Sequence, residues 1–145
     1  MTAAARYEQL WRELALADES GFDFGFCVEH HFNPNESWMP SPSIYCAVAA
    51  ARTRRLRIGT MGNIVPLYDP LRIPEDAAVL DNVANGRFEL GLVSGIVPDF
   101  FGPYGADFQN RRALTHEALL FIKQALSSAG AFSFAGESRR YQDVT

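Results

Sequence analysis

The chain has 145 residues, 48% of them hydrophobic and 21% charged, which is the composition of an ordinary globular domain with a core. With a net charge of −4, the chain does not have the excess of basic residues that is typical of nucleic-acid-binding proteins. No apolar run approaches the roughly 18 residues of a membrane span. Cys27 and Cys46 lie in apolar segments, which predicts buried thiols in a reducing cytoplasm. The N-terminus predicts an amphipathic polar helix and no signal peptide.

Apolar side chains recur at helical spacing in four segments, which are residues 3–20, 42–53, 73–84 and 109–127. Gly21 follows the first segment as a C-terminal stop. The second segment is rich in alanine, which allows close packing against another element. Ser41 is expected to cap it, with Pro42 at its first position.

Short apolar runs predict strands over residues 22–28, 56–60 and 87–93, each followed by a loop and a helix. The strands begin 34 and then 31 residues apart, the spacing of strand–helix units in a parallel sheet. Loops that leave the strands are long, so function is expected at the carboxyl edge of the sheet. No G-x-G-x-x-G follows the first strand, which disfavours a Rossmann unit. The tail, residues 128–145, is expected to be an extended or hairpin segment.

The first strand runs directly into Glu29, His30 and His31. In α/β barrels the chemistry lies where strands end at the carboxyl face, so these side chains are candidates for function. The alternative is that Glu29 and His31 are structural hydrogen-bonding groups and that His30 lines a loop. No metal site is expected, because adjacent histidines on an extended segment do not easily reach one ion and H-E-x-x-H and C-x-x-C motifs are absent.

Five groups of stretches occur in order along nearly the whole chain. They are Gly21–Asp23; Glu29–Phe32; Arg57–Thr60 with Val65–Arg72; Leu80–Asp81 with Asn85–Gly91; and Phe100–Phe101 with Tyr104–Gly105 and Asn110–Leu114. Together they resemble the bacterial luciferase-like flavin monooxygenases. The resemblance implies a (β/α)8 TIM barrel that binds reduced FMN, or the deazaflavin F420, at the carboxyl ends of its strands. It also implies O2-dependent oxidation of an aldehyde or another small organic substrate.

His30 matches the catalytic histidine of this family, which acts during the reaction of the flavin with oxygen. An imidazole can give or take a proton near pH 7, so the residue type suits that role. Met61 and Gly62 match a segment whose backbone lies against the flavin ring, where the family has a non-proline cis peptide. Gly62 would ease the close approach; the alternative is an ordinary loop glycine.

Arg112 matches an arginine that contacts the cofactor phosphate, and it falls in the first turn of the fourth predicted helix, where the helix dipole favours anions. Arg111 beside it is expected to be solvated. Ser94 stands where close relatives often have an arginine, which removes a phosphate contact, and Val93 stands where the luciferases have a reactive cysteine. The implied cofactor-binding set is therefore Met61, Gly62, Val93, Ser94 and Arg112.

A complete barrel takes about 250 residues, and the three predicted strands match strands two to four of the family. The chain is therefore expected to be a single fragment, residues 1–145, that forms a partial barrel of three to four parallel strands with helices outside. Its exposed edges favour a homodimer or another oligomer, and family members dimerise through the helices after the second and third strands. Asp81 and Arg87 flank a tight turn and are expected to form a structural pair.

Two functions follow from the sequence. The first is a cytoplasmic flavin-dependent monooxygenase, or a fragment of one, that uses O2, a small-molecule substrate and a flavin or F420 reductase as partner. The alternative is a non-catalytic chain, either a degenerate flavin-binding protein or the dimerisation remnant of a broken gene.

Overall fold

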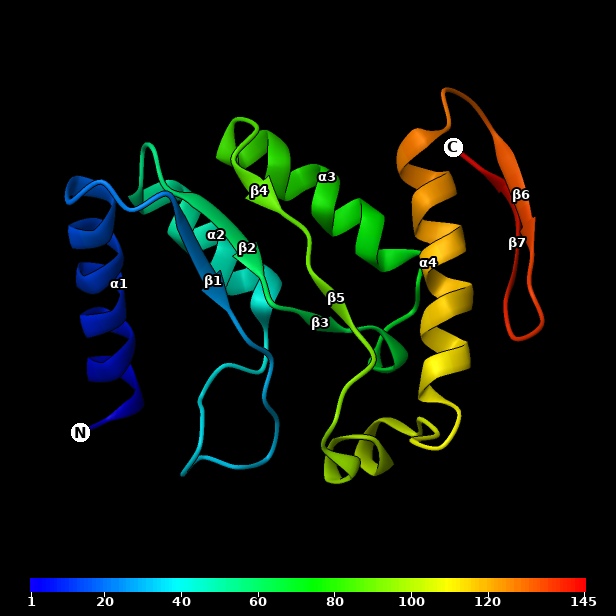
Figure 1. Ribbon diagram of the computed structural model, residues 1–145, viewed down its shortest axis with the longest axis horizontal. Helices are drawn as coiled ribbons and strands as arrows, with labels where there is room; N and C mark the ends of the chain where they lie inside the picture. The colour runs from blue at the N-terminus through cyan, green and yellow to red at the C-terminus, as the bar shows by residue number, and fades with distance from the viewer. The chain divides into compact units, whose positions relative to one another are not determined.

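The computed structural model describes residues 1–145 and has an α/β architecture of short strands and longer helices (Figure 1). The chain divides into two compact units. The first unit comprises Met1–Asn63 and Ala77–Leu92, and the second comprises Ile64–Asp76 and Val93–Thr145. No helix is both long enough and apolar enough to cross a membrane.

Four helices match the four predicted segments to within two residues. They are α1 (Ala3–Glu19), α2 (Pro42–Arg52), α3 (Arg72–Ala84) and α4 (Arg111–Ser127). The strands are β1 (Phe24–Cys27), β2 (Arg57–Thr60), β3 (Asn63–Ile64), β4 (Phe88–Glu89), β5 (Leu92–Val93), β6 (Phe132–Ala135) and β7 (Arg140–Val144). Three single turns of 3₁₀ helix complete the chain, at η1 (Val65–Leu67), η2 (Pro98–Phe100) and η3 (Gly102–Tyr104).

The first unit contains a parallel three-stranded sheet in the order β1-β2-β4, which confirms the parallel arrangement predicted from the strand spacing. Phe24 pairs with Arg57 and Cys27 with Thr60, so β1 and β2 end at the same edge. The predicted strand over residues 87–93 is wrong in one respect, because it is two short strands, β4 and β5, separated at Gly91. A Cβ atom at Gly91 would clash with the backbone oxygen of Thr60, so this close approach requires glycine.

The helices of the first unit cover one face of this sheet. The core that they form with it comprises Leu14, Cys27, Tyr45, Cys46, Ala49, Ala50, Leu56, Ile58, Leu80 and Ala84. Cys27 and Cys46 are free, buried thiols, as predicted, and the hydrogen bond to Cys27 together with burial raises the pKa of Cys46. The opposite face of β1 is bare, because Phe24 is 51% exposed and Phe26 42% exposed. Apolar side chains thus face both sides of β1, as in a barrel strand between an outer helix layer and an inner core.

A buried carboxylate joins α1 to the start of β2. Asp18 accepts hydrogen bonds from the backbone N–H groups of Arg54, Arg55 and Leu56, at 2.8, 2.8 and 2.6 Å. Burial acts to raise the pKa of Asp18, but these three N–H groups and the charge of Arg87 outweigh it and hold the pKa below its ordinary value. The carboxylate therefore stays ionised and satisfies donors that the turn leaves unpaired.

Arg87 does not form the predicted pair with Asp81. Its guanidinium donates to the carbonyl oxygens of Ala50, Thr53 and Leu56, at 3.1, 3.3 and 2.7 Å. Two of these carbonyls lie at the C-terminal end of α2, where the helix leaves its last carbonyl groups without intrahelical partners and where a cation is favoured.

The predicted cap of α2 is confirmed only in part. Pro42 begins the helix, as expected, but the Ser41 side chain makes no capping hydrogen bond.

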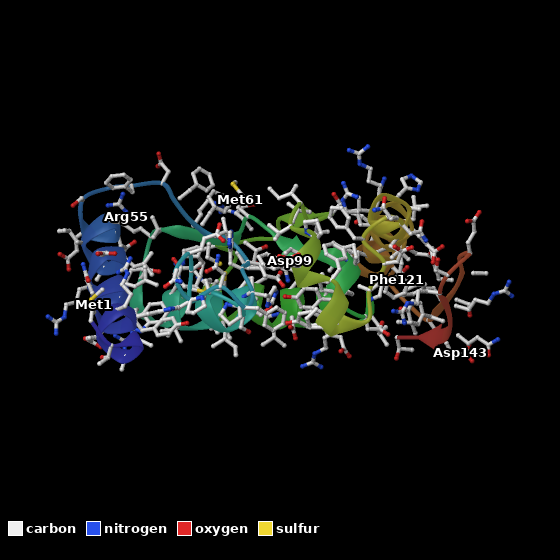
Figure 2. The ribbon with its side chains drawn as sticks, turned by 90° about the horizontal axis from the view of Figure 1, so that it is seen from below. Met1, Arg55, Met61, Asp99, Phe121 and Asp143 are labelled. Carbon is white, nitrogen blue, oxygen red and sulfur yellow. The ribbon has the colours of Figure 1, made fainter.

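In the second unit a β-hairpin packs on α4. Strands β6 and β7 are antiparallel, and Figure 1 shows them alongside α4. Phe121 of α4, labelled in Figure 2, is 1% exposed and contacts the rings of Phe132, Phe134 and Tyr141 from the hairpin. Glu117, one turn earlier on α4, accepts the backbone N–H groups of the hairpin turn, residues 137–139. One aromatic and one carboxylate thus hold the hairpin against the helix.

Candidate functional site

His30 follows the carboxyl end of β1 and is held at the mouth of a loop. Its backbone N–H donates to the carbonyl oxygen of Met39 at 3.0 Å, which closes the loop between the two residues. In the side chain of His30, Nδ1 lies 3.4 Å from Oε1 of Glu36, a residue of that loop. The His30 side chain is about a quarter exposed and Glu36 about half exposed, so the imidazole has access to solvent or to a ligand.

The neighbouring pair Glu29 and His31 is structural. Nε2 of His31 lies 2.6 Å from Oε1 of Glu29, and both side chains are almost completely buried. Of the two interpretations considered from the sequence, the structural one therefore holds for these two residues. His30 differs from them because its ring is accessible, and it remains the candidate for chemistry.

The peptide bond between Met61 and Gly62 is cis, as the family resemblance implies. The N–H group of Met61 donates to the carbonyl oxygen of Cys27 at 2.6 Å, so the cis segment is fastened to the end of β1. His30 is three residues beyond Cys27, so the histidine and the cis peptide lie at the same edge of the sheet. The Met61 side chain is 58% exposed, and Figure 2 shows it directed away from the ribbon.

Gly62 lies where the backbone of a second segment comes close. A Cβ atom at this position would be 2.7 Å from the carbonyl oxygen of Gly91, a distance that no side chain tolerates without a backbone shift. The same carbonyl accepts hydrogen bonds from the Asn63 N–H group at 2.9 Å and from the Thr60 hydroxyl at 2.8 Å. Gly62 is therefore more than an ordinary loop glycine.

Asn63, next along the chain, was not identified from the sequence. It is 4% exposed, and its Oδ1 atom is buried without a hydrogen-bond partner. A buried amide oxygen without a donor costs free energy, which a ligand that presents an N–H or O–H group would recover. Asparagine in a loop is common, so the sequence alone offers no signal that separates this residue from a turn former.

In the second unit the loop after β5 is tied to the start of α4. The Arg111 guanidinium donates from Nε to the carbonyl oxygen of Gly95 at 3.1 Å and lies 3.9 Å above the ring of Phe108. The expectation that Arg111 is solvated is therefore wrong, because an aromatic face and a loop carbonyl hold its side chain. Ser94 immediately precedes this anchored glycine.

Arg112 is exposed in the first turn of α4, whose start is Arg111. Its neighbour Arg111 is committed to the loop, so Arg112 is the guanidinium that remains accessible at this helix N-terminus. Val93 is 37% exposed and presents an apolar surface beside Ser94. Thus His30, Met61 and Gly62 lie together in the first unit, and Val93, Ser94 and Arg112 belong to the second.

The chain has extensive similarity to known proteins. The model of the family "Luciferase-like monooxygenase" matches residues 1–145. An alkanal monooxygenase alpha chain of Photorhabdus laumondii is 34% identical over 112 residues, which are 77% of this chain and 31% of that protein. The chain spans about a third of the length of the curated relatives that it matches.

Two solved structures have the same architecture over this part of the fold. The monooxygenase RslO1 from Streptomyces bottropensis matches with a TM-score of 0.94 and 30% identity, over 99% of this chain and 43% of its own. The oxygenating constituent of 3,6-diketocamphane monooxygenase from Pseudomonas putida, solved in complex with FMN, matches with a TM-score of 0.89 and 20% identity, over 100% of this chain and 40% of its own.

These matches confirm the fold class predicted from the sequence, an α/β chain that corresponds to part of a TIM barrel. The family match extends from the first residue to the last, and it includes every residue of the candidate site. The chain belongs to the luciferase-like monooxygenase family.

Proposed function

We propose that the chain is part of a flavin-dependent monooxygenase that oxidises a small organic molecule, such as an aldehyde, with O2. The observation that carries the proposal is the cis peptide between Met61 and Gly62, fastened by a backbone hydrogen bond to the same strand that leads into His30. The family match supports the reaction class, and the FMN bound to the Pseudomonas putida relative supports FMN as cofactor. F420 is the second candidate.

The residues at the carboxyl edge fit a flat, hydrogen-bonding cofactor. The close contact of Gly62 with the Gly91 backbone holds the cis segment in place, and the unpartnered Oδ1 of Asn63 can accept a hydrogen bond from such a ligand. A bound reduced flavin would supply the electrons that activate O2. The Met61–Gly62 backbone would lie against its ring, and His30 would hold or release a proton at the imidazole.

In the second unit, three residues match positions that contact the cofactor in the family. The exposed guanidinium of Arg112 suits a phosphate, because it forms paired charge-assisted hydrogen bonds and the α4 dipole adds to the attraction. Val93 would provide an apolar wall. Ser94 would offer a hydroxyl in place of the arginine common in close relatives.

The proposed partners follow from this chemistry. The protein would take a small-molecule substrate and O2, would receive reduced flavin from a separate flavin or F420 reductase, and would work in the cytoplasm. The bare apolar face of β1, which includes Phe24 and Phe26, favours a homodimer or another oligomer, because exposed apolar surface of this kind drives association.

The test is a titration of the 145-residue chain with oxidised FMN, followed by quenching of flavin fluorescence. We expect saturable binding that Gly62→Ala abolishes, because the new methyl would force the cis segment away from Gly91. Gly130→Ala is the matched control, since a Cβ atom there meets nothing within 4 Å. Titration with F420 alongside identifies the preferred cofactor.

The phosphate contact is tested by comparing FMN with riboflavin, which lacks the phosphate. Arg112→Ala should weaken FMN binding about tenfold or more and leave riboflavin binding unchanged, because a hydrogen bond to a charged group contributes about 1.5–3 kcal/mol. The matched control is Arg54→Ala, which removes another exposed arginine. An equal loss for both ligands would contradict the assigned role.

His30→Ala separates the enzyme from the non-catalytic alternative. If the chain is catalytic, this variant should retain flavin binding and lose oxidation of an aldehyde in the presence of reduced FMN and O2. Binding without turnover in the unsubstituted chain would favour the degenerate flavin-binding protein. Failure to bind either FMN or F420 would refute the proposed function of this chain.

A further inference from the structure

The long loop after β5, residues 94–110, contributes to a small apolar core in the second unit. Phe100 and Phe101 are buried, at 4% and 1% exposed, and pack with Ile64 of the same unit. The ring of Phe101 meets that of Phe108 edge to face, with the ring centres 5.1 Å apart. The loop is therefore packed against its own unit and does not extend freely into solvent.

Gly95 fixes the path by which the chain leaves β5. Its backbone is left-handed, with a φ of +77°, a conformation that glycine adopts readily. A Cβ atom there would lie 2.8 Å from Cγ2 of Ile64 and 2.9 Å from Cζ of Phe101, so the backbone lies directly against this apolar core. Because Gly95 is buried, its carbonyl oxygen needs a hydrogen-bond donor from the protein.

The Arg111 guanidinium supplies that donor and joins the two ends of the loop. Nε donates to the carbonyl oxygen of Gly95 at 3.1 Å, and Nη1 donates to the carbonyl oxygen of Phe108 at 2.9 Å. The guanidinium also lies over the Phe108 ring, 3.9 Å from its centre. Since Arg111 is the first residue of α4, one side chain fastens the beginning and the end of the loop to the start of this helix.

Ser94 and Arg112, the two polar residues that the proposed function assigns to the cofactor in this unit, adjoin this contact. Ser94 directly precedes Gly95, and Arg112 directly follows Arg111. We propose that Arg111 is a positioning residue, which holds Ser94 and Arg112 in a fixed relation and so forms the phosphate end of the flavin site before the cofactor arrives. The inference rests on the proposed function.

The role of Arg111 differs from that of Arg112 beside it. The Arg111 side chain donates to Gly95 and Phe108, whereas Arg112 is exposed and available to a ligand. A site that is formed in advance binds its ligand more tightly, because less conformational freedom is lost on binding. The gain should be confined to ligands with a phosphate, since the loop and the helix start that Arg111 joins would contact that group.

The first test needs no flavin. Amide hydrogen exchange is compared between the unsubstituted chain and Arg111→Met, which keeps an apolar chain beside the Phe108 ring but removes every donor. The N–H groups of Phe101 and Ala106 donate to carbonyl oxygens inside the loop, so their exchange reports opening of the loop. We expect both groups to exchange about tenfold faster or more in the variant, because hydrogen bonds from a charged group are lost. Unchanged exchange would overturn the inference.

The second test separates positioning from a general structural role. Arg111→Lys keeps the positive charge, but an ammonium lacks the planar fork that donates to two carbonyls while it stacks on an aromatic ring. This variant should bind FMN several-fold more weakly and riboflavin unchanged, measured by quenching of flavin fluorescence. Arg140→Lys is the matched control, because it makes the same change at an exposed arginine of the same unit. An equal loss for both flavins, or no loss for either, would overturn the inference.

The two tests also distinguish this inference from the proposed function. If the unsubstituted chain binds neither FMN nor riboflavin, the proposed function fails, and the phosphate role of Arg111 fails with it. If the chain binds both flavins but the exchange of the loop amides does not depend on Arg111, the positioning role alone fails.

Discussion

Asp18 provides the sharpest test of how the first unit is held together. Its buried carboxylate accepts three backbone N–H groups at the start of β2, from Arg54, Arg55 and Leu56. Asp18→Ala removes the acceptor and leaves these donors in a place where water reaches them incompletely. Each buried donor without a partner costs about 1–3 kcal/mol, and since two of the three belong to exposed residues, the expected loss is about 3–5 kcal/mol.

A loss of this size is a large part of the roughly 5–15 kcal/mol that stabilises a typical domain. The assay is urea denaturation followed by far-ultraviolet circular dichroism at pH 7, with Glu19→Ala as the control, because that carboxylate is adjacent in sequence and exposed. We expect the control to change the free energy of unfolding by less than about 0.5 kcal/mol. A loss below about 1 kcal/mol in Asp18→Ala would refute the assigned role.

The same carboxylate predicts how stability depends on pH. The pKa of Asp18 is lowered in the folded chain, so its contribution is complete above the unfolded pKa of about 3.9 and is lost as the pH falls through the folded value. The difference in unfolding free energy between the unsubstituted chain and Asp18→Ala should therefore be constant near neutral pH and should shrink below about pH 4. A difference that grows on acidification would contradict the sign.

Three further changes test other parts of the fold. Gly91→Ala should destabilise the chain by about 2 kcal/mol or more, measured by urea denaturation, because its methyl group would meet a backbone oxygen of β2; an unchanged midpoint would contradict the close approach. Phe121→Ala should cost about 3–5 kcal/mol and release the hairpin, with the loss visible in the near-ultraviolet circular dichroism. Glu117→Gln should accelerate amide hydrogen exchange in the hairpin turn about tenfold, since one amide oxygen replaces two carboxylate oxygens that accept three N–H groups; exchange rates equal to those of the unsubstituted chain would show that the turn is held in another way.

The helices and the parallel sheet were predictable because their signals are local. Apolar periodicity, Gly21 after α1 and Asn85–Gly86 after α3 fix the elements to within a few residues, and the structure gives left-handed backbone at all three of these positions. The break between β4 and β5 was not predictable in the same way. It depends on the backbone of β2 lying against Gly91, a contact between segments about 30 residues apart.

The candidate site was likewise predictable only in part. His30 and the Met61–Gly62 segment were identified from family motifs, and the cis peptide implied by those motifs is present. The contacts of Glu36 and the unpartnered oxygen of Asn63 were not foreseen, because a loop's hydrogen bonds depend on which residues its path brings together. The prediction that Arg111 is solvated was wrong for the same reason.

The sequence by itself determined the class of fold, the family and the strand end that carries His30. Each of these can be recognised from local periodicity or from motifs, without knowledge of the tertiary structure. Only the tertiary structure decided the partners of the charged groups. Arg87 was expected to bind Asp81 and instead binds the carbonyls at the end of α2, while Asp18 satisfies three N–H groups of a turn more than 30 residues away. The physical reason is that these charged side chains bind backbone groups that burial leaves without hydrogen-bond partners. Which groups those are depends on how the elements pack.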